Sequence, residues 1–308
     1  MRPRHLAFPV AAGLLCFTAC DYMDWSDMER FSRDFHYSYG LSRDGRISVE
    51  TFNGSVEVSG WDRDTVDISG TKYGPTQQAA DDLKVNIDNS RDSIAIRVAR
   101  PDMRRNNLGA RFVIKIPRAA VLDRITTSNG EIRTADGSGP ARLRTSNGPV
   151  RVTSFQGTLD VGTSNGPVDL VDVDGDTVAH TSNGRIHAER LNGTLDATTS
   201  NNAVDADLKP SDRPVHVQTS NGPVDLRLPD GFRREVRVNT NNSGITLHLP
   251  MSVDAHVLAR TSNSSISTDF DLRMQGEFSK NHLDANIGTG GALLDLSTSN
   301  GPIRLVKH

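Results

Sequence analysis

Apolar residues recur along the chain in a fixed phase with a repeated Thr-Ser-Asn triplet. Aliphatic side chains stand four and two positions before the Thr, and again five and seven positions after it. Each set alternates with polar residues with a period of two, which predicts two strands per repeat, each with one inward face. The triplets begin at Thr127, Thr145, Thr163, Thr181, Thr199, Thr219, Thr261 and Thr298, with a Thr-Asn-Asn variant at Thr240.

The spacing of the repeats predicts the fold. The first five copies are 18 residues apart, and the next three gaps are 20 to 21 residues. Parallel stacking explains such spacing, because each coil then places like residues about 4.8 Å above like residues. An antiparallel meander would not require it, and a hexapeptide helix would need an aliphatic residue at every sixth position. We therefore predict an all-β parallel β-helix (β-solenoid) of two-strand coils, right-handed by the usual crossover rule.

The two turns of each coil have their own signals. The Ser-Asn-Gly sequence forms the first, and a glycine column twelve positions after the Thr, beginning at Gly139, predicts the second. The last gap between triplets, 37 residues, is interpreted as two coils of which one is degenerate.

The chain divides into three predicted regions. Residues 1–19 are a signal peptide, residues 20–45 a tether and N-terminal cap, and residues 46–308 the solenoid. Within the solenoid, residues 46–126 form irregular coils with insertions and residues 127–308 form regular coils. Four local features are also expected: a short helix at 77–83, an exposed basic loop at 101–109, a loop at 270–283, and a second cap near Lys307 and His308.

The N-terminal segment predicts export and a lipid anchor. Arg2 and Arg4 precede about fourteen apolar residues, fewer than the roughly 20 that span a bilayer. Cys20 follows Phe17-Thr18-Ala19, which resembles a bacterial lipobox with Phe17 in place of the usual Leu. We expect an acyl chain on Cys20 and an exported protein anchored to a bacterial membrane on its periplasmic or cell-surface side. Ordinary cleavage that leaves a free Cys20 is the alternative.

The most repeated polar residues are interpreted as structural. The Thr shares the inward face of the preceding strand, and the Asn two positions later is expected on the same side, at the turn. Buried amides must find partners, so stacked Asn side chains should bond to one another along the solenoid. The predicted ladder contains Asn129, Asn147, Asn165, Asn183, Asn201, Asn221, Asn242, Asn263 and Asn300.

One outward column could carry chemistry. Asp169, His187 and Asp205 should lie on consecutive rungs, a spacing that would suit a metal or an acid–base pair. Simple charge alternation is the favoured interpretation, because like charges directly opposite one another destabilise a sheet. The acidic segment 172–176 suggests calcium but is better interpreted as a turn. No catalytic, cofactor or metal motif stands out, so we expect no cofactor and no enzyme.

Charge excludes one class of partner. Without the predicted signal peptide the chain has 33 basic and 38 acidic residues. A nucleic-acid binder typically has a basic footprint, so no nucleic-acid partner is expected.

The repeats resemble a family of bacterial candidate adhesins that is otherwise described as a domain of unknown function. The resemblance rests on the Thr-Ser-Asn-Gly-Pro-Val copies, on Phe112–Pro117 and Ile245–Pro250, and on the ending from Leu294 to Ile303, and it covers roughly residues 45–306. It implies a β-helix at the cell envelope and supplies no catalytic residues.

Three functions follow as expectations. The first is a lipid-anchored, non-catalytic binding, adhesin-like or scaffolding module, whose partners are the membrane and an envelope protein or glycan. The alternatives are a β-helix polysaccharide lyase or hydrolase, and an envelope-stress accessory protein that acts through protein contacts.

Overall fold

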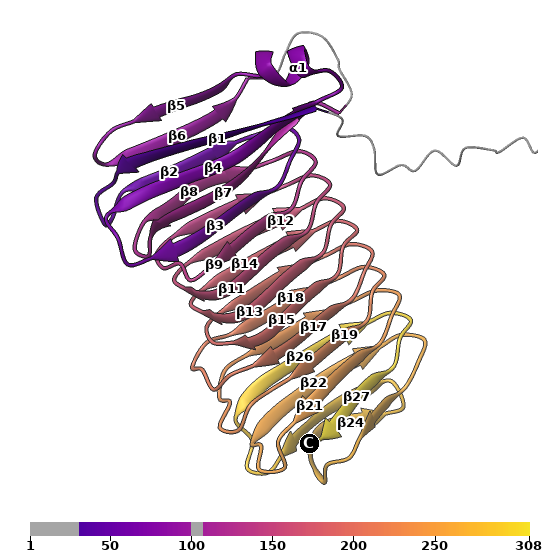
Figure 1. The fold of residues 1–308 in the computed structure, drawn as a ribbon. Helices are drawn as coiled ribbons and strands as arrows, with labels where there is room; N and C mark the ends of the chain where they lie inside the picture. The colour runs from indigo at the N-terminus through magenta and orange to yellow at the C-terminus, as the bar shows by residue number, and fades with distance from the viewer. Residues whose placement is uncertain (1–30, 100–106) are drawn as a thin grey trace, which may run out of the picture.

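The computed structural model describes residues 31–99 and 107–308 as one elongated stack of strands. The N-terminal strands lie at one end and the C-terminal strands at the other, and between them the chain winds in coils (Figure 1). Every coil contributes one strand to each of two large sheets, which confirms the all-β, two-strand solenoid. Most of the basic loop predicted at 101–109 lies outside the described residues.

The strands of the two sheets run as follows. Sheet A has thirteen strands, in the spatial order β1 (Phe31–Gly40), β4 (Thr65–Gly74), β7 (Gly109–Pro117), β3 (Val56–Trp61), β9 (Ile132–Ala135), β11 (Val150–Gln156), β13 (Val168–Asp174), β15 (Ile186–Leu191), β17 (Val204–Leu208), β19 (Val224–Arg227), β21 (Ile245–Leu249), β27 (Ile303–Lys307) and β23 (Ile266–Thr268). Sheet B has fourteen, in the order β24 (Leu272–Ser279), β25 (His282–Ile287), β22 (Ala255–Thr261), β26 (Ala292–Thr298), β20 (Val236–Asn239), β18 (Val215–Gln218), β16 (Leu195–Thr198), β14 (Thr177–Thr181), β12 (Leu159–Thr163), β10 (Ala141–Arg144), β8 (Val121–Thr126), β2 (Arg46–Glu50), β6 (Ser93–Val98) and β5 (Val85–Asn89).

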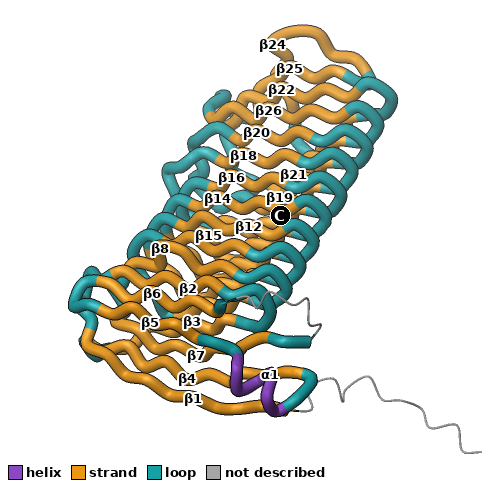
Figure 2. The backbone as a smooth tube through the Cα atoms, turned by 90° about the horizontal axis from the view of Figure 1, so that it is seen from above, coloured by secondary structure: helices purple, strands orange, loops and turns teal. Residues whose placement is uncertain are grey.

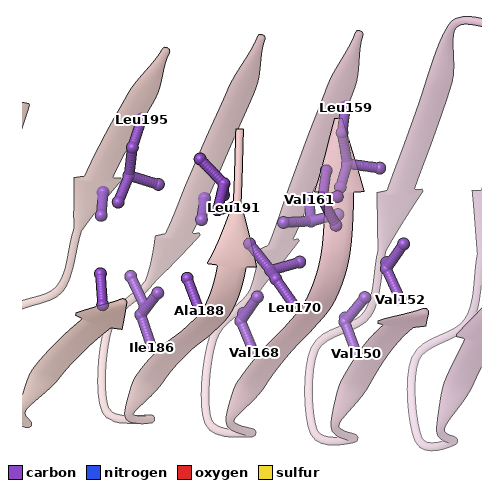
Figure 3. Close-up of a cluster of buried hydrophobic side chains, with 14 of the residues drawn as sticks. Val150, Val152, Leu159, Val161, Val168, Leu170, Ile186, Ala188, Leu191 and Leu195 are labelled. Atoms are coloured by element: carbon purple, nitrogen blue, oxygen red, sulfur yellow. The ribbon is translucent and has the colours of Figure 1, made fainter. Parts of the chain in front are cut away.

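The middle of the stack has the predicted register. Val150, Val168, Ile186 and Val204 stand opposite one another in parallel neighbouring strands. These aliphatic columns from the two sheets meet in a narrow core, where Val168 and Leu170 of sheet A approach Leu159 and Val161 of sheet B (Figure 3). Aliphatic residues therefore stack on equivalent aliphatic residues along the core, as the spacing of the repeats predicts.

The second turn depends on glycine. Gly139, Gly157, Gly175 and Gly193 have φ between 95° and 145°, a region that L side chains rarely adopt. The column occurs in the four successive 18-residue coils that begin at Thr127, Thr145, Thr163 and Thr181.

Chain order is broken at both ends of the stack. At the N-terminal end the coil β2–β3 lies between β8–β9 and the later coil β6–β7. At the C-terminal end the last coil, β26–β27, lies between β20–β21 and the earlier coil β22–β23. The expectation that the segment near Lys307 and His308 caps the stack is therefore wrong, because β27 pairs on both sides.

Antiparallel strands close both ends. At the C-terminal end, β24 and β25 form a hairpin that continues sheet B beyond β22. The loop predicted at 270–283 and the degenerate second coil are therefore wrong, because alternating residues such as Leu283 and Ala285 face the core as strand residues. At the N-terminal end, β4 and β1 continue sheet A in antiparallel order.

One short helix was predicted correctly. Helix α1 (Gln77–Asp82) begins after Thr76, whose hydroxyl accepts a hydrogen bond from the Ala79 N–H at 3.1 Å. It packs near β1 and β4 through Ala79 and Ala80, which are buried. No helix in the described residues is long and apolar enough to cross a membrane.

Candidate functional site

The repeated Thr residues form hydrogen bonds that join each coil to a neighbouring coil. The Thr163 hydroxyl donates to the Gly148 carbonyl at 2.9 Å and accepts from the Gly166 N–H at 3.1 Å. Equivalent hydroxyl–carbonyl bonds recur up the stack, and all of these Thr side chains are buried. The Gly at the third position after the Thr is needed for the same approach, since a Cβ on Gly166 would lie 1.9 Å from the Gly148 oxygen.

The Asn side chains form the predicted ladder. Each amide nitrogen donates to the amide oxygen of the neighbouring coil at 2.6 to 2.8 Å, and Asn53 joins the ladder at its N-terminal end. The expected burial is wrong: all nine predicted members are exposed. The turn reverses the chain after the Ser, so strand parity does not extend from the buried Thr to the Asn.

The outward column lies as the sequence predicts. Asp169 stands opposite His187, and His187 stands opposite Asp205, in three neighbouring parallel strands. The column continues to Asp225, directly opposite Asp205. The three predicted residues are thus brought together by register.

Arginine side chains form ion pairs with the carboxylates of this column. Asp169 lies 3.3 Å from Arg151 Nε, and Asp205 lies 2.6 Å from Arg185 Nε. Arg185 also approaches His187 Nδ1 at 3.2 Å. The hydrogen bond from Arg151 to Glu131, together with the charge of Asp169, raises the pKa of Arg151. No three His, Cys, Asp or Glu side chains of the described ranges are grouped to hold a metal ion. The charges do not alternate along the column as expected, since Arg151 stands opposite Arg133 and Asp205 opposite Asp225. Asp169 and Asp205 are instead each paired with an arginine of a neighbouring coil.

Sequence comparison places the fold in a family. A family model described as Toastrack DUF4097 matches residues 45–257, more than half of the chain. The chain belongs to the Toastrack DUF4097 family.

Solved structures and curated proteins add little to this assignment. The chain is similar to a candidate adhesin from Parabacteroides merdae, with 11% identity over 89% of this chain and 96% of that one and a TM-score of 0.48. A candidate adhesin from Bacteroides fragilis has 10% identity over 89% and 97%, with a TM-score of 0.40. A candidate cell adhesion protein from Clostridium sporogenes has 12% identity over 90% and 100%, with a TM-score of 0.26. No curated protein matches the sequence.

In this Toastrack protein the acidic segment 172–176 is part of the stack: residues 172–174 end strand β13, and the turn begins at Gly175. Asp172 receives Arg190 Nη2 at 2.7 Å and Lys209 Nζ at 3.0 Å, and these hydrogen bonds hold its pKa well below the usual range. Asp174 accepts from Asn192 at 3.0 Å, and Asp176 accepts from Thr194 at 2.8 Å. The next coils thus supply a partner for each carboxylate, which favours a structural role over a calcium loop, although the predicted turn is confined to the end of the segment.

The arginines are the residues that sequence reasoning missed. Arg151 belongs to the outward column itself, but Arg185 stands two positions before His187 and reaches Asp205 diagonally. The signal that could have found it is an Arg two positions before the outward column, facing an acidic residue in the next coil. Cys20, the predicted lipid site, lies outside the described residues.

Proposed function

We propose that this Toastrack protein is a non-catalytic binding or scaffolding module of the bacterial cell envelope, tethered to a membrane by a lipid on Cys20. The observation that carries the proposal is the outward face of sheet A around Asp169 and Asp205. Its carboxylates are held by arginines of the same stack, so it offers a fixed array of ion pairs rather than convergent reacting groups.

Rigidity supports a binding role. Backbone pairing, the Thr–carbonyl bonds and the Asn ladder all fix one coil on the next. Outward groups are therefore held at the strand spacing of about 4.8 Å over many coils. A surface with fixed charge spacing recognises a partner with little ordering cost. An envelope protein or an anionic or zwitterionic glycan is the partner that this chemistry fits.

The anchor is tested by fractionation of the cells that make the protein. We expect the full chain to collect with membranes and a Cys20→Ser variant to become soluble. Cys16→Ser is the matched control, because Cys16 lies in the predicted signal peptide and its loss should leave the protein in the membrane fraction. Membrane association that survives Cys20→Ser would contradict the anchor.

The binding face is tested by a pair of charge exchanges. Arg151→Asp with Asp169→Arg alters sheet A, while Arg142→Asp with Asp160→Arg alters an equivalent inter-coil pair on sheet B. We expect the sheet A exchange to lose cross-linked envelope partners and the sheet B exchange to retain them. Equal retention by both would exclude this face. Depolymerisation of a uronate polymer that is abolished by Asp169→Asn would favour the enzyme instead.

A further inference from the structure

Strand β1 is built to be covered on one face. Phe31, Phe35, Tyr37 and Tyr39 alternate with Ser, Asp and His residues, which is typical of a half-buried strand. The aromatic set points toward the core side of sheet A, because the Phe35 ring lies 5.7 Å from the ring of buried Phe112. Yet Phe31 and Tyr37 remain 38% and 40% exposed.

The cause is an unequal number of strands at this end of the stack. Beyond the coil β6–β7, sheet A continues with two strands, β4 and β1, whereas sheet B continues with β5 alone. No strand of the described residues therefore faces β1, which lies at the outer edge of the stack (Figure 2). Helix α1 packs against part of β1, where Asp81 pairs with Arg33. Beside it lies a hollow of about 680 Å³, lined by Phe35, Tyr37 and Val85 and by the charged Arg33, Asp34, Lys72, Asp81 and Lys84.

The outer edge of β1 is also unpaired within the described part of the chain. The Leu41 N–H donates to the Asp64 carbonyl at 3.2 Å, and the same in-register pairing continues along β1 and β4. Odd-numbered residues of β1 thus bond to β4, and the N–H and C=O groups of even-numbered residues such as His36 and Ser38 point outward. Natural proteins usually protect an edge strand of this length, because it pairs readily with another chain.

We propose that two copies of this chain interlock through their N-terminal ends. A two-fold axis along the strand direction brings sheet A of one copy into line with sheet B of its partner. Each β1 then occupies the vacant position beside the partner's β5, and the two aromatic faces pack against each other at the usual sheet separation of about 10 Å. The extra strand of sheet A in each copy thus fills the position that sheet B of the other copy lacks. Such self-complementarity is what a two-fold interface requires.

The charges in the hollow permit this packing. Arg33 pairs with Asp81 at 2.9 Å, and Lys72 Nζ donates to the carbonyls of Asp81 and Leu83 at 3.1 and 3.0 Å. Two of the three Arg and Lys side chains that line the hollow, Arg33 and Lys72, thus have partners before the second copy arrives, and the third is Lys84. Two β1–β5 ladders, each limited by the five residues of β5, would supply about ten hydrogen bonds, the usual number for a stable interface.

The test measures molar mass by light scattering, using the full chain with Cys20→Ser so that no acyl chain drives association. We expect a dimer for this protein and for Tyr37→Phe, and a monomer for Tyr37→Glu. Val178→Glu is the matched control, since Val178 is 46% exposed but lies far along sheet B, and it should remain a dimer. Circular dichroism and melting temperature show that each variant is folded.

A second variant tests the edge separately from the face. Ser38→Pro removes an N–H that points outward, and an edge strand tolerates proline there without losing its bonds to β4. We expect its dimer dissociation constant to rise at least tenfold. The proposal would be overturned if the parent protein were a monomer at all concentrations, whether or not residues 20–30 were then found to cover the aromatic face. So would a dimer that neither Tyr37→Glu nor Ser38→Pro weakens.

Discussion

The middle and the ends of this solenoid are made of the same two-strand coil, but they are assembled differently. From β10–β11 to β20–β21, each coil rests on the coil that precedes it in the chain. At each end, one coil is instead held between two coils that lie on the same side of it in the chain. The coil β2–β3 lies between the later coils β6–β7 and β8–β9, and β26–β27 lies between the earlier coils β20–β21 and β22–β23. Order in space thus follows order in sequence only where the repeat is regular.

The difference shows how a repeat protein ends. In a stack held by nearest-neighbour contacts, an outermost coil has one neighbour and frays easily. Here the last coil of the chain, β26–β27, has a neighbour on each side, and the antiparallel hairpin β24–β25 occupies the outermost positions of sheet B. Insertion makes the last coil as well supported as a middle one.

The largest expected effect compares an inserted coil with a middle coil. Leu296 of β26 and Leu195 of β16 are both fully buried, so each substitution by Ala should cost about 2–5 kcal/mol. For Leu296→Ala we expect lost hydrogen-exchange protection in residues 255–287, which precede it in the chain but stack on it. For Leu195→Ala the loss should centre on β14, β16 and β18. Loss confined to residues 292–307 in Leu296→Ala would show that the inserted coil does not support its neighbours.

The spacing of the repeats explains which part of this order could be predicted. An 18-residue gap leaves a coil no alternative but to stack on the coil before it. The final copy, Leu294 to Ile303, carries the same residues as every other copy, so it fits equally well beside β20 or outside β22. Only the closing hairpin β24–β25, which occupies the outer position, decides between them.

The candidate site also has one part that the repeat spacing predicts and one part that it does not. The register of Asp169, His187 and Asp205 follows directly from the period and was predictable. Their arginine partners were not, because a long Arg side chain can reach either of two neighbouring coils or a residue on its own strand. Arg151 contacts Glu131 on one side and Asp169 on the other.

Close approach at the first turn gives the next largest effect. A Cβ on Gly166 would lie 1.9 Å from a backbone oxygen of the coil below, whereas a Cβ on Gly162 would meet only the movable Arg144 side chain at 3.1 Å. We expect Gly166→Ala to destabilise the protein by about 1–3 kcal/mol in urea unfolding. Gly162→Ala should change stability much less. Equal effects would mean that the turn relaxes and does not fix the coil spacing.

Two buried threonines should respond in opposite directions. The Thr181 hydroxyl bonds to the Gly166 carbonyl at 3.1 Å and to the Gly184 N–H at 3.0 Å, so Thr181→Val should cost about 1–3 kcal/mol. The Thr134 hydroxyl is equally buried but has no hydrogen-bond partner in the part of the chain that the structure describes. Thr134→Val should therefore be neutral or stabilising in thermal unfolding. A similar loss in both would mean that packing of the methyl groups, rather than the hydrogen bonds, sets the effect.

The Asn ladder gives the smallest effect and returns to the contrast between middle and end. Asn183 bonds to Asn165 and to Asn201, each at 2.7 Å, whereas Asn263 stands last in the ladder and bonds only to Asn300 within it, at 2.8 Å. Each bond is exposed, so its removal should cost at most about 1 kcal/mol. Urea unfolding should therefore show a loss for Asn183→Ala about twice that for Asn263→Ala. If the two losses are equal, the amides act independently, and the ladder follows from the stacking of the coils without adding to it.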